Sequence, residues 1–239
     1  MLAEARLPRS SLRATAALSF AIGAGHVSPA LAASSYRVLY TFEGTTDGNT
    51  PNGNLVADSA GNLYGTAGGG GKHCNGYGCG VVFEITAGGR EKVLYAFAGR
   101  SDGSGPQGGL IRDNKGNLYG TATTGGAGYG GVVSKITPRG GEKVLYAFTD
   151  GSDGGWPETG VIRDKQGNLY GTTELFGQYY CGTVFKLALD GTETTLYTFT
   201  GGSDGEYSIS NLVMRNGKLY GTTIGGGAND AGVIYSFKP

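Results

Sequence analysis

The sequence predicts an all-β fold built from four copies of one antiparallel sheet, and three observations support this prediction. A motif ending in Leu-Tyr-Gly-Thr occurs four times, with its tyrosines 55, 51 and 50 residues apart, at Tyr64, Tyr119, Tyr170 and Tyr220. Each period holds four short runs of aromatic and β-branched residues between glycine-rich turns. No helical pattern of useful length follows residue 33. Four-stranded units repeated at a period near 50 residues indicate a four-bladed β-propeller.

The second copy illustrates the unit, with strands expected at 109–112, 117–121, 131–136 and 143–148. The first two are joined by residues 113–117, where Asp hydrogen-bonds the turn and Gly supplies a positive φ. Asp-Gly steps also precede the first strand of every copy, at Asp47, Asp102, Asp153 and Asp204. We interpret all these aspartates as turn formers. A ring of calcium ligands is the alternative, because calcium prefers oxygen ligands.

The phase of the copies predicts how the ring closes. After the leader the chain begins with an outer-strand sequence at 37–42, and it ends with a third-strand sequence at 232–237. The last sheet therefore lacks an outer strand, which the N-terminal run can supply. We expect sixteen strands in four complete blades, closed by this pairing, which protects edges that invite aggregation. The alternative is half of a larger ring completed by a second chain.

Residues 1–32 have the composition of a secretory signal peptide, followed by a propeller domain at 33–239. Three arginines come first, then an apolar Ala-rich run, then small residues before the expected cleavage site after Ala32. A disordered or helical arm is the alternative. The apolar run is too short to span a membrane, and no later segment is long enough. We expect export to the periplasm, the cell surface or the medium.

The charge balance argues against nucleic acid as a partner. Without residues 1–32 the chain has 16 basic and 18 acidic side chains, a net charge of −2. Binding to nucleic acid needs clustered cations that neutralise phosphates, and the chain has no basic stripe. We expect a monomer, with a carbohydrate or a cell-surface protein as its partner.

The cysteines and histidines limit the chemistry further. Cys74 and Cys79 enclose a short glycine-containing loop, and export permits a disulfide between them. Cys181 is left over, either as a free thiol or for a bridge to a partner. His73 is the only histidine after the leader, which disfavours a zinc site and histidine-based nucleophilic catalysis. We therefore expect no cofactor and no metal.

Several strings resemble the GloVer tandem repeat of exported bacterial choice-of-anchor proteins. They are Gly-Thr-Val-Phe-Lys-Leu at 182–187, Leu-Tyr-Thr-Phe at 196–199, Gly-Gly-Ser-Asp-Gly at 201–205, and Asn-Leu-Tyr-Gly-Thr. The resemblance covers residues 36–239. It implies a propeller-like protein, exported or attached to a surface, whose role is unassigned, and it brings no catalytic residues. The sequence stops at Pro239 after the last expected strand, so we expect no sorting tail.

The third copy differs most from the others, in two loops expected on the same face of one blade. Loops on a rigid scaffold commonly carry binding sites. We take as candidate binding residues the side chains that are special to these loops, Trp156, Glu158, Glu174, Phe176, Tyr179 and Tyr180. Exposed aromatic rings beside carboxylates suit stacking on sugar rings. The alternative is that Trp156 and Phe176 only pack the loops onto the blade.

These observations lead us to expect a non-enzymatic binding module for a glycan or a protein. The first alternative is a secreted polysaccharide-active hydrolase or lyase, in which Asp153, Glu158 and Glu174 supply the acid and the base. The second alternative is a purely structural surface module.

Overall fold

The computed structural model describes residues 35–74 and 78–239, so the expected signal peptide lies outside the described residues. The compact unit spans Val38–Pro239. Its described residues contain strands and turns and no helix. Accordingly, this part of the chain has no helix long and apolar enough to cross a membrane.

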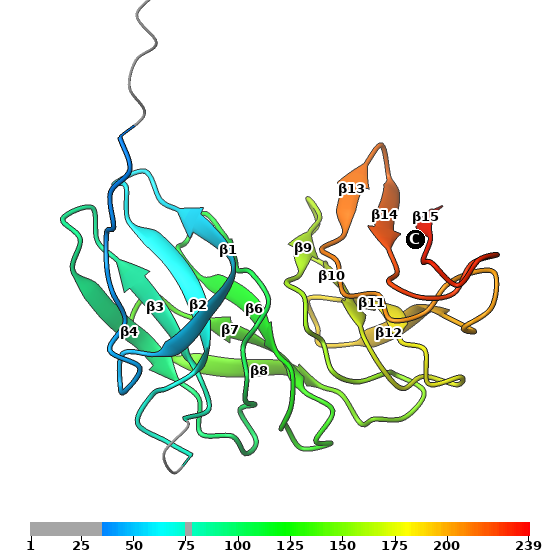
Figure 1. The fold of residues 1–239 in the computed structure, drawn as a ribbon, viewed down its shortest axis with the longest axis horizontal. Helices are drawn as coiled ribbons and strands as arrows, with labels where there is room; N and C mark the ends of the chain where they lie inside the picture. The colour runs from blue at the N-terminus through cyan, green and yellow to red at the C-terminus, as the bar shows by residue number, and fades with distance from the viewer. Residues whose placement is uncertain (1–34, 75–77) are drawn as a thin grey trace, which may run out of the picture. The chain divides into compact units, whose positions relative to one another are not determined.

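Four antiparallel sheets follow one another along the chain, as the colours of Figure 1 show. The first sheet comprises β1 (Asn49–Ala57), β2 (Leu63–Gly69), β3 (Val81–Ile85) and β4 (Glu91–Ala96). The second comprises β5 (Ile111–Arg112), β6 (Leu118–Ala122), β7 (Val132–Ile136) and β8 (Glu142–Ala147). The third comprises β9 (Ile162–Arg163), β10 (Leu169–Thr173), β11 (Thr183–Leu187) and β12 (Glu193–Thr198). The fourth comprises β13 (Val213–Arg215), β14 (Lys218–Thr222) and β15 (Ile234–Phe237).

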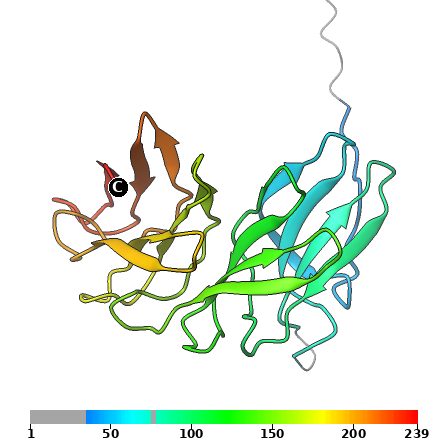
Figure 2. The same cartoon turned by 180° about the vertical axis from the view of Figure 1, so that it is seen from behind.

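The fourth sheet has three strands, with β15 at its unpaired edge (Figure 2). The described residues therefore contain fifteen strands where the sequence predicts sixteen. Residues 37–42 form no strand, and ring closure is not seen. The repeated sheets follow from the sequence pattern, whereas the closing contact joins the two ends of the chain and depends on the whole ring.

The repeated motif forms the second strand of every sheet; it is fully buried at β10, whereas three of its five residues are exposed at β14. Its glycine is required by close approach: a Cβ on Gly171 would lie 2.6 Å from the ring of Phe185 on the neighbouring strand. In the first three copies its tyrosine hydroxyl donates to the turn aspartate; the Tyr64 hydroxyl lies 2.9 Å from Asp58 Oδ2. That aspartate also accepts backbone N–H groups, so it forms the turn, as the sequence predicts.

The core lies at the junctions between consecutive sheets. An outer-strand phenylalanine packs edge-on against the third strand of the next sheet, as Phe148 does against Phe185 with ring centroids 5.1 Å apart. Phe42 makes the equivalent contact with Phe83 of the first sheet, also at 5.1 Å. The N-terminal run thus packs on the first sheet as an outer strand packs on the sheet that follows it.

Candidate functional site

Two loops of the third copy pair with each other at one end of its sheet. Gly155 and Leu175 exchange two backbone hydrogen bonds of 3.0 and 3.2 Å. The Glu174 N–H donates to the Trp156 carbonyl at 3.0 Å. These bonds join the segment before β9 to the segment after β10, so the candidate residues of both loops are brought together.

The aromatic side chains of these loops form a small exposed cluster. The rings of Trp156 and Phe176 have centroids 6.5 Å apart, and those of Phe176 and Tyr180 are 6.2 Å apart. Trp156 is 37% exposed and Tyr180 is 70% exposed, so the cluster presents ring surface to solvent. Tyr179 is exposed as well but makes no ring contact with the others among the described residues.

The backbone of the cluster is in the left-handed region. Trp156, Phe176 and Tyr180 have φ values of 57°, 62° and 61°. The positions equivalent to Phe176 in the other three copies are Gly70, Gly125 and Gly226, all with positive φ. A side chain in this conformation costs about 1–2 kcal/mol. Non-glycine residues in such conformations concentrate at functional sites. Only Phe176 is special to the third copy in this respect, because other copies also have non-glycine residues with positive φ at the positions of Trp156 and Tyr180, as at Tyr207 and Cys74.

The two glutamates of the loops form a coupled pair. Burial raises the pKa of Glu174, and the charge of the neighbouring Glu158 raises it further. Two nearby carboxyl groups cannot both ionise easily, so one tends to keep its proton. Asp153 is not part of this pair, because its Oδ2 accepts the Tyr146 hydroxyl at 2.9 Å and the Thr149 N–H at 2.9 Å.

Glu158 also lines a pocket of about 230 Å³ to which all four copies contribute. The other lining residues come from the equivalent segments before or at the first strand of each copy, and they are Asn52, Gly53, Gln107, Gly108, Gly109, Thr159, Ile209 and Asn211. Glu158 is the only ionisable side chain among them. Equivalent positions in the other copies hold Asn52, Gln107 and Ile209, so the third copy alone contributes a carboxylate to this pocket.

One further residue beside the cluster was not expected from the sequence, Asp150. It has φ 59°, where the other copies have Gly44, Gly99 and Gly201. Its Oδ1 is buried without a hydrogen-bond partner, and burial, followed by the charge of Asp153, raises its pKa. Only comparison of the four copies, which shows Asp in a glycine position, would have singled it out.

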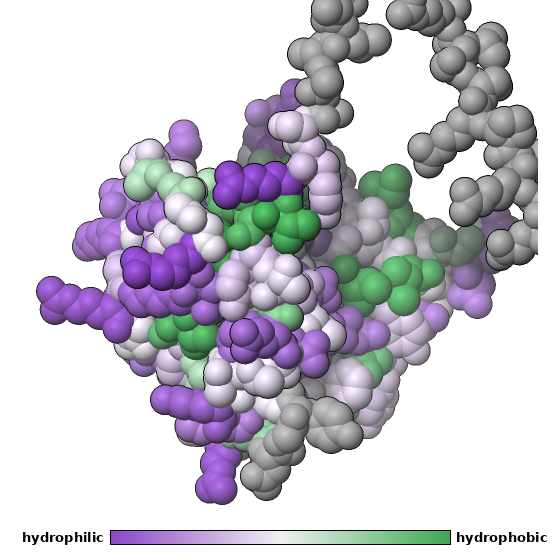
Figure 3. All heavy atoms as spheres, turned by 60° about the vertical axis from the view of Figure 1, so that its left-hand side comes forward, coloured by the Kyte–Doolittle hydropathy of each residue, from purple (hydrophilic) through white to green (hydrophobic). Residues whose placement is uncertain are grey.

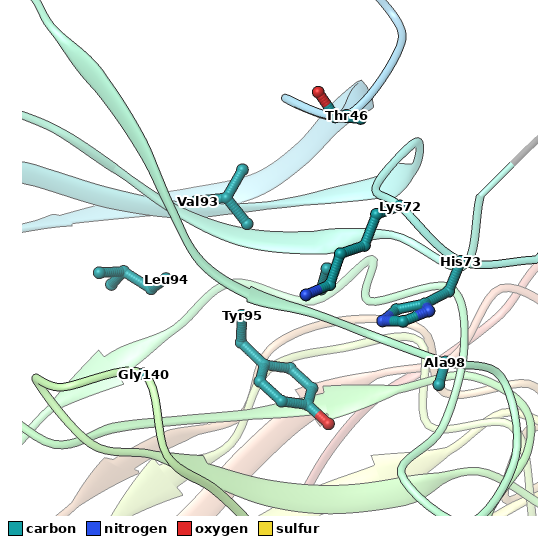
Figure 4. A pocket seen from close by; sticks show the side chains of 9 residues that line it. Thr46, Lys72, His73, Val93, Leu94, Tyr95, Ala98 and Gly140 are labelled. Atoms are coloured by element: carbon teal, nitrogen blue, oxygen red, sulfur yellow. The ribbon is translucent and has the colours of Figure 1, made fainter.

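A larger pocket, of about 600 Å³, lies elsewhere, along β4. Lys72 and His73 extend side by side toward the strand that carries Tyr95 (Figure 4). No carboxylate lines this pocket, and the Tyr95 hydroxyl already donates to Asp102 at 2.8 Å. It therefore lacks a carboxyl pair like that of Glu158 and Glu174. The adjoining Cys74 and Cys79 are joined in a disulfide, and Cys181 is a buried free thiol.

Comparison with known protein families identifies the family of this chain. The sequence profile of the Gloeobacter/Verrucomicrobia repeat matches residues 15–150 and 76–239. The chain belongs to this family. A comparison with proteins of curated function finds no match.

The solved structures similar to this member of the Gloeobacter/Verrucomicrobia repeat family are β-propeller-like proteins. A gluconolactonase from Xanthomonas campestris is 17% identical, with a TM-score of 0.47, over 73% of this chain and 54% of that one. An α-L-arabinofuranosidase from Clostridium thermocellum is 17% identical, with a TM-score of 0.47, over 78% and 67%. A GH62 α-L-arabinofuranosidase domain from Coprinopsis cinerea is 12% identical, with a TM-score of 0.41, over 82% and 66%. The chain spans little more than half the length of the gluconolactonases that it matches, 58% and 54%.

These comparisons correct one expectation. The sequence led us to expect a non-enzymatic binding module, and that expectation is wrong, because the similar structures are named as enzymes. The identities are too low to transfer any residue, so any catalytic role has to be argued from the geometry of this chain.

Proposed function

We propose that the mature chain is an exported polysaccharide-active enzyme that cleaves glycosidic bonds with Glu158 and Glu174. The carboxyl pair carries this proposal: burial and the neighbouring Glu158 raise the pKa of Glu174, and Glu158 lines the pocket shared by the four copies. A carboxyl group with a raised pKa is suited to act as a general acid. The cluster of Trp156, Phe176 and Tyr180 beside them offers ring surface for stacking on sugars.

In the proposed hydrolysis, Glu174 donates its proton to the oxygen of the glycosidic bond as the bond to the anomeric carbon breaks. Glu158 accepts a proton from the water that attacks that carbon, so one C–O bond is exchanged for another. Inverting pairs are about 6.5–9.5 Å apart, so the hydrogen-bonded carboxyl groups of Glu158 and Glu174 have to separate when the substrate enters. The raised pKa of Glu174 keeps it protonated above the usual range of a glutamate, near 4.3. Activity is expected to fall as pH rises through the pKa of Glu174.

The test measures new reducing ends after incubation of the mature chain with a panel of polysaccharides. Glu174→Gln and Glu158→Gln are each expected to lower the rate by about 10²–10⁴-fold, the usual contribution of an acid or base. Glu43→Gln, an exposed carboxylate in the equivalent loop region of the first copy, is the control and should act as wild type. Unsaturated product, detected by its ultraviolet absorbance, would indicate a lyase. The proposal fails if no polysaccharide is cleaved, or if both Gln variants remain fully active.

The same proposal includes a closed ring, because the pocket at Glu158 needs all four copies. Residues 36–42 align with the outer strands, and Phe42 packs as an outer-strand phenylalanine does. Val81 pairs with Ala96 in the first sheet, so the equivalent register in the fourth places Thr41 opposite Val233.

Oxidation of a Thr41→Cys/Val233→Cys variant tests this register. We expect a cross-link within one chain, seen as faster migration on a non-reducing gel, and no cross-link in either single variant. A cross-link between chains would show instead that a second copy completes the sheet. The absence of any cross-link in the folded double variant would contradict this pairing.

A further inference from the structure

A further pocket lies at the junction of the second and third sheets. This junction carries more positive charge than the first. The pocket measures about 280 Å³. Tyr119, Lys135 and Lys143 line it from the second sheet, and Leu169, Leu187 and the turn at 188–191 line it from the third. That turn joins β11 to β12, at the end of the sheet opposite the loops with Glu158 and Glu174. The pocket is therefore separate from the proposed acid–base pair.

The two lysines face each other directly across β7 and β8. Lys135 pairs with Lys143, and Lys135 also pairs with Tyr119 on its other side, so all three side chains lie on one face of the sheet. Like charges in directly opposite positions are destabilising. Arg163 adds a third positive charge, with its guanidinium carbon 5.7 Å from the centre of the Tyr119 ring.

The equivalent positions in the other sheets do not concentrate charge in this way. The first sheet has Glu84 opposite Lys92, and the third has Lys186 opposite Thr194. Arg112 lies over Tyr64 at the first junction as Arg163 lies over Tyr119 at the second. The second sheet has Lys135 at the position where the first sheet has Glu84. The second junction therefore has three cations and no acidic residue at these paired positions.

One carboxylate, Asp190, lines the pocket and is already used by its own turn. Its Oδ1 accepts the Thr192 N–H at 2.9 Å, and this bond holds its pKa below the usual range. It partly offsets the charge of the three cations and leaves the group positive overall. The walls are otherwise largely apolar, with Leu145, Leu169, Leu187 and Leu189 around the cations.

We propose that this pocket binds the anionic group of an acidic saccharide, a sulfate ester or a carboxylate, with its sugar ring against the leucines. The anion would neutralise a lysine pair that has no counter-charge across the strand. The leucine surface gives a reason for a sugar-borne anion to bind better than a free one. The assignment stands independently of catalysis at Glu174.

Isothermal titration of the mature chain at low ionic strength tests this site. The three probes are a sulfated oligosaccharide, a uronic-acid oligosaccharide and inorganic sulfate, and a neutral oligosaccharide serves as blank. Lys135→Glu recreates the charge pattern of the first sheet and is expected to weaken binding at least tenfold. Glu84→Gln is the matched control at the first junction and should leave the affinity unchanged. Glu174→Gln should also bind as wild type, which separates this site from the proposed catalytic pair.

The results distinguish a saccharide-borne anion from a free anion, and they also test whether the pocket binds an anion at all. Tighter binding of either acidic oligosaccharide than of inorganic sulfate supports the proposal. Equal binding of inorganic sulfate and both oligosaccharides would overturn the saccharide assignment and leave a site for free anions. Should Lys135→Glu fail to fold, Lys143→Thr, which copies Thr194 of the third sheet, takes its place. No binding of any acidic probe, or equal affinity in the folded charge variants, would overturn the site altogether.

Discussion

Two features of Asp150 lower the stability of the folded protein. Its left-handed φ costs about 1–2 kcal/mol relative to glycine, and a buried polar atom without a partner, its Oδ1, costs about 1–3 kcal/mol. Glycine in turn loses more chain entropy on folding, which removes about 0.4–1 kcal/mol of the gain. We expect Asp150→Gly to raise the free energy of unfolding by about 1–3 kcal/mol, measured by urea unfolding at pH 7.

Two comparisons control this prediction. The pKa of Asp150 is raised in the folded protein, so the cost of its charge is present above that pKa and disappears as pH falls below it. The gain from Asp150→Gly should therefore be larger at pH 7 than at pH 4. Gly201→Asp places the same residue at the equivalent position of the fourth copy, φ 75°, and should destabilise the protein. A loss of stability in Asp150→Gly would contradict the argument.

Strands and loops differ in how well the sequence predicts them. The repeated hairpins were predictable because alternating apolar residues and turn-forming residues determine the local structure. Asp113, for example, accepts the Lys115 and Asn117 N–H groups, as expected of a turn aspartate. The sequence also placed Trp156 and Glu174 in neighbouring loops. It could not reveal the Gly155–Leu175 pairing that joins them, because backbone bonds between loops carry no residue signature.

Strand length and edge pairing were harder to predict than strand position. The first strands of the second and third sheets are only two residues long, whereas β1 has nine residues and includes the pocket residues Asn52 and Gly53. The outer strand expected at residues 37–42 was not found, since its partner β15 comes from the other end of the chain. Pairing between the two ends of the chain depends on the geometry of every sheet between them. The local sequence pattern does not encode that geometry.

At the scale of the whole molecule, a carboxyl pair recurs at each of the first three sheets. The outer strand of one sheet begins with a glutamate that faces the turn aspartate before that sheet: Glu91 with Asp47, Glu142 with Asp102, and Glu193 with Asp153. Burial first, with repulsion from that aspartate, raises the pKa of Glu142 to about 7. Burial likewise raises the pKa of Glu193 to about 7, although the Thr195 hydroxyl, 3.2 Å from its Oε1, opposes the shift. The face shown in Figure 3 is mostly polar, with small apolar patches between the polar side chains.

The buried glutamates predict a loss of stability near neutral pH. Their folded pKa of about 7 lies above the ordinary value of 4.5, so their contribution is complete below pH 4.5 and is lost as pH rises through 7. Asp58 acts in the opposite sense, because hydrogen bonds from Asn62 and Tyr64 outweigh desolvation and lower its pKa to about 2. Its contribution is present above pH 3.8 and is lost as pH falls toward 2. Thermal unfolding at constant ionic strength should therefore show a maximum Tm between about pH 4 and 6.

Isosteric variants distinguish this cause from general charge repulsion. Glu142→Gln and Glu193→Gln should leave Tm unchanged at pH 4.5 and raise it at pH 8, because the amide cannot ionise. Glu43→Gln removes an exposed carboxylate and serves as the control with no change in the pH profile. A wild-type Tm that stays constant from pH 5 to 8, or Gln variants with the wild-type slope, would show that these glutamates ionise without cost. The stability of the junctions between sheets would then not depend on the protonation of these glutamates.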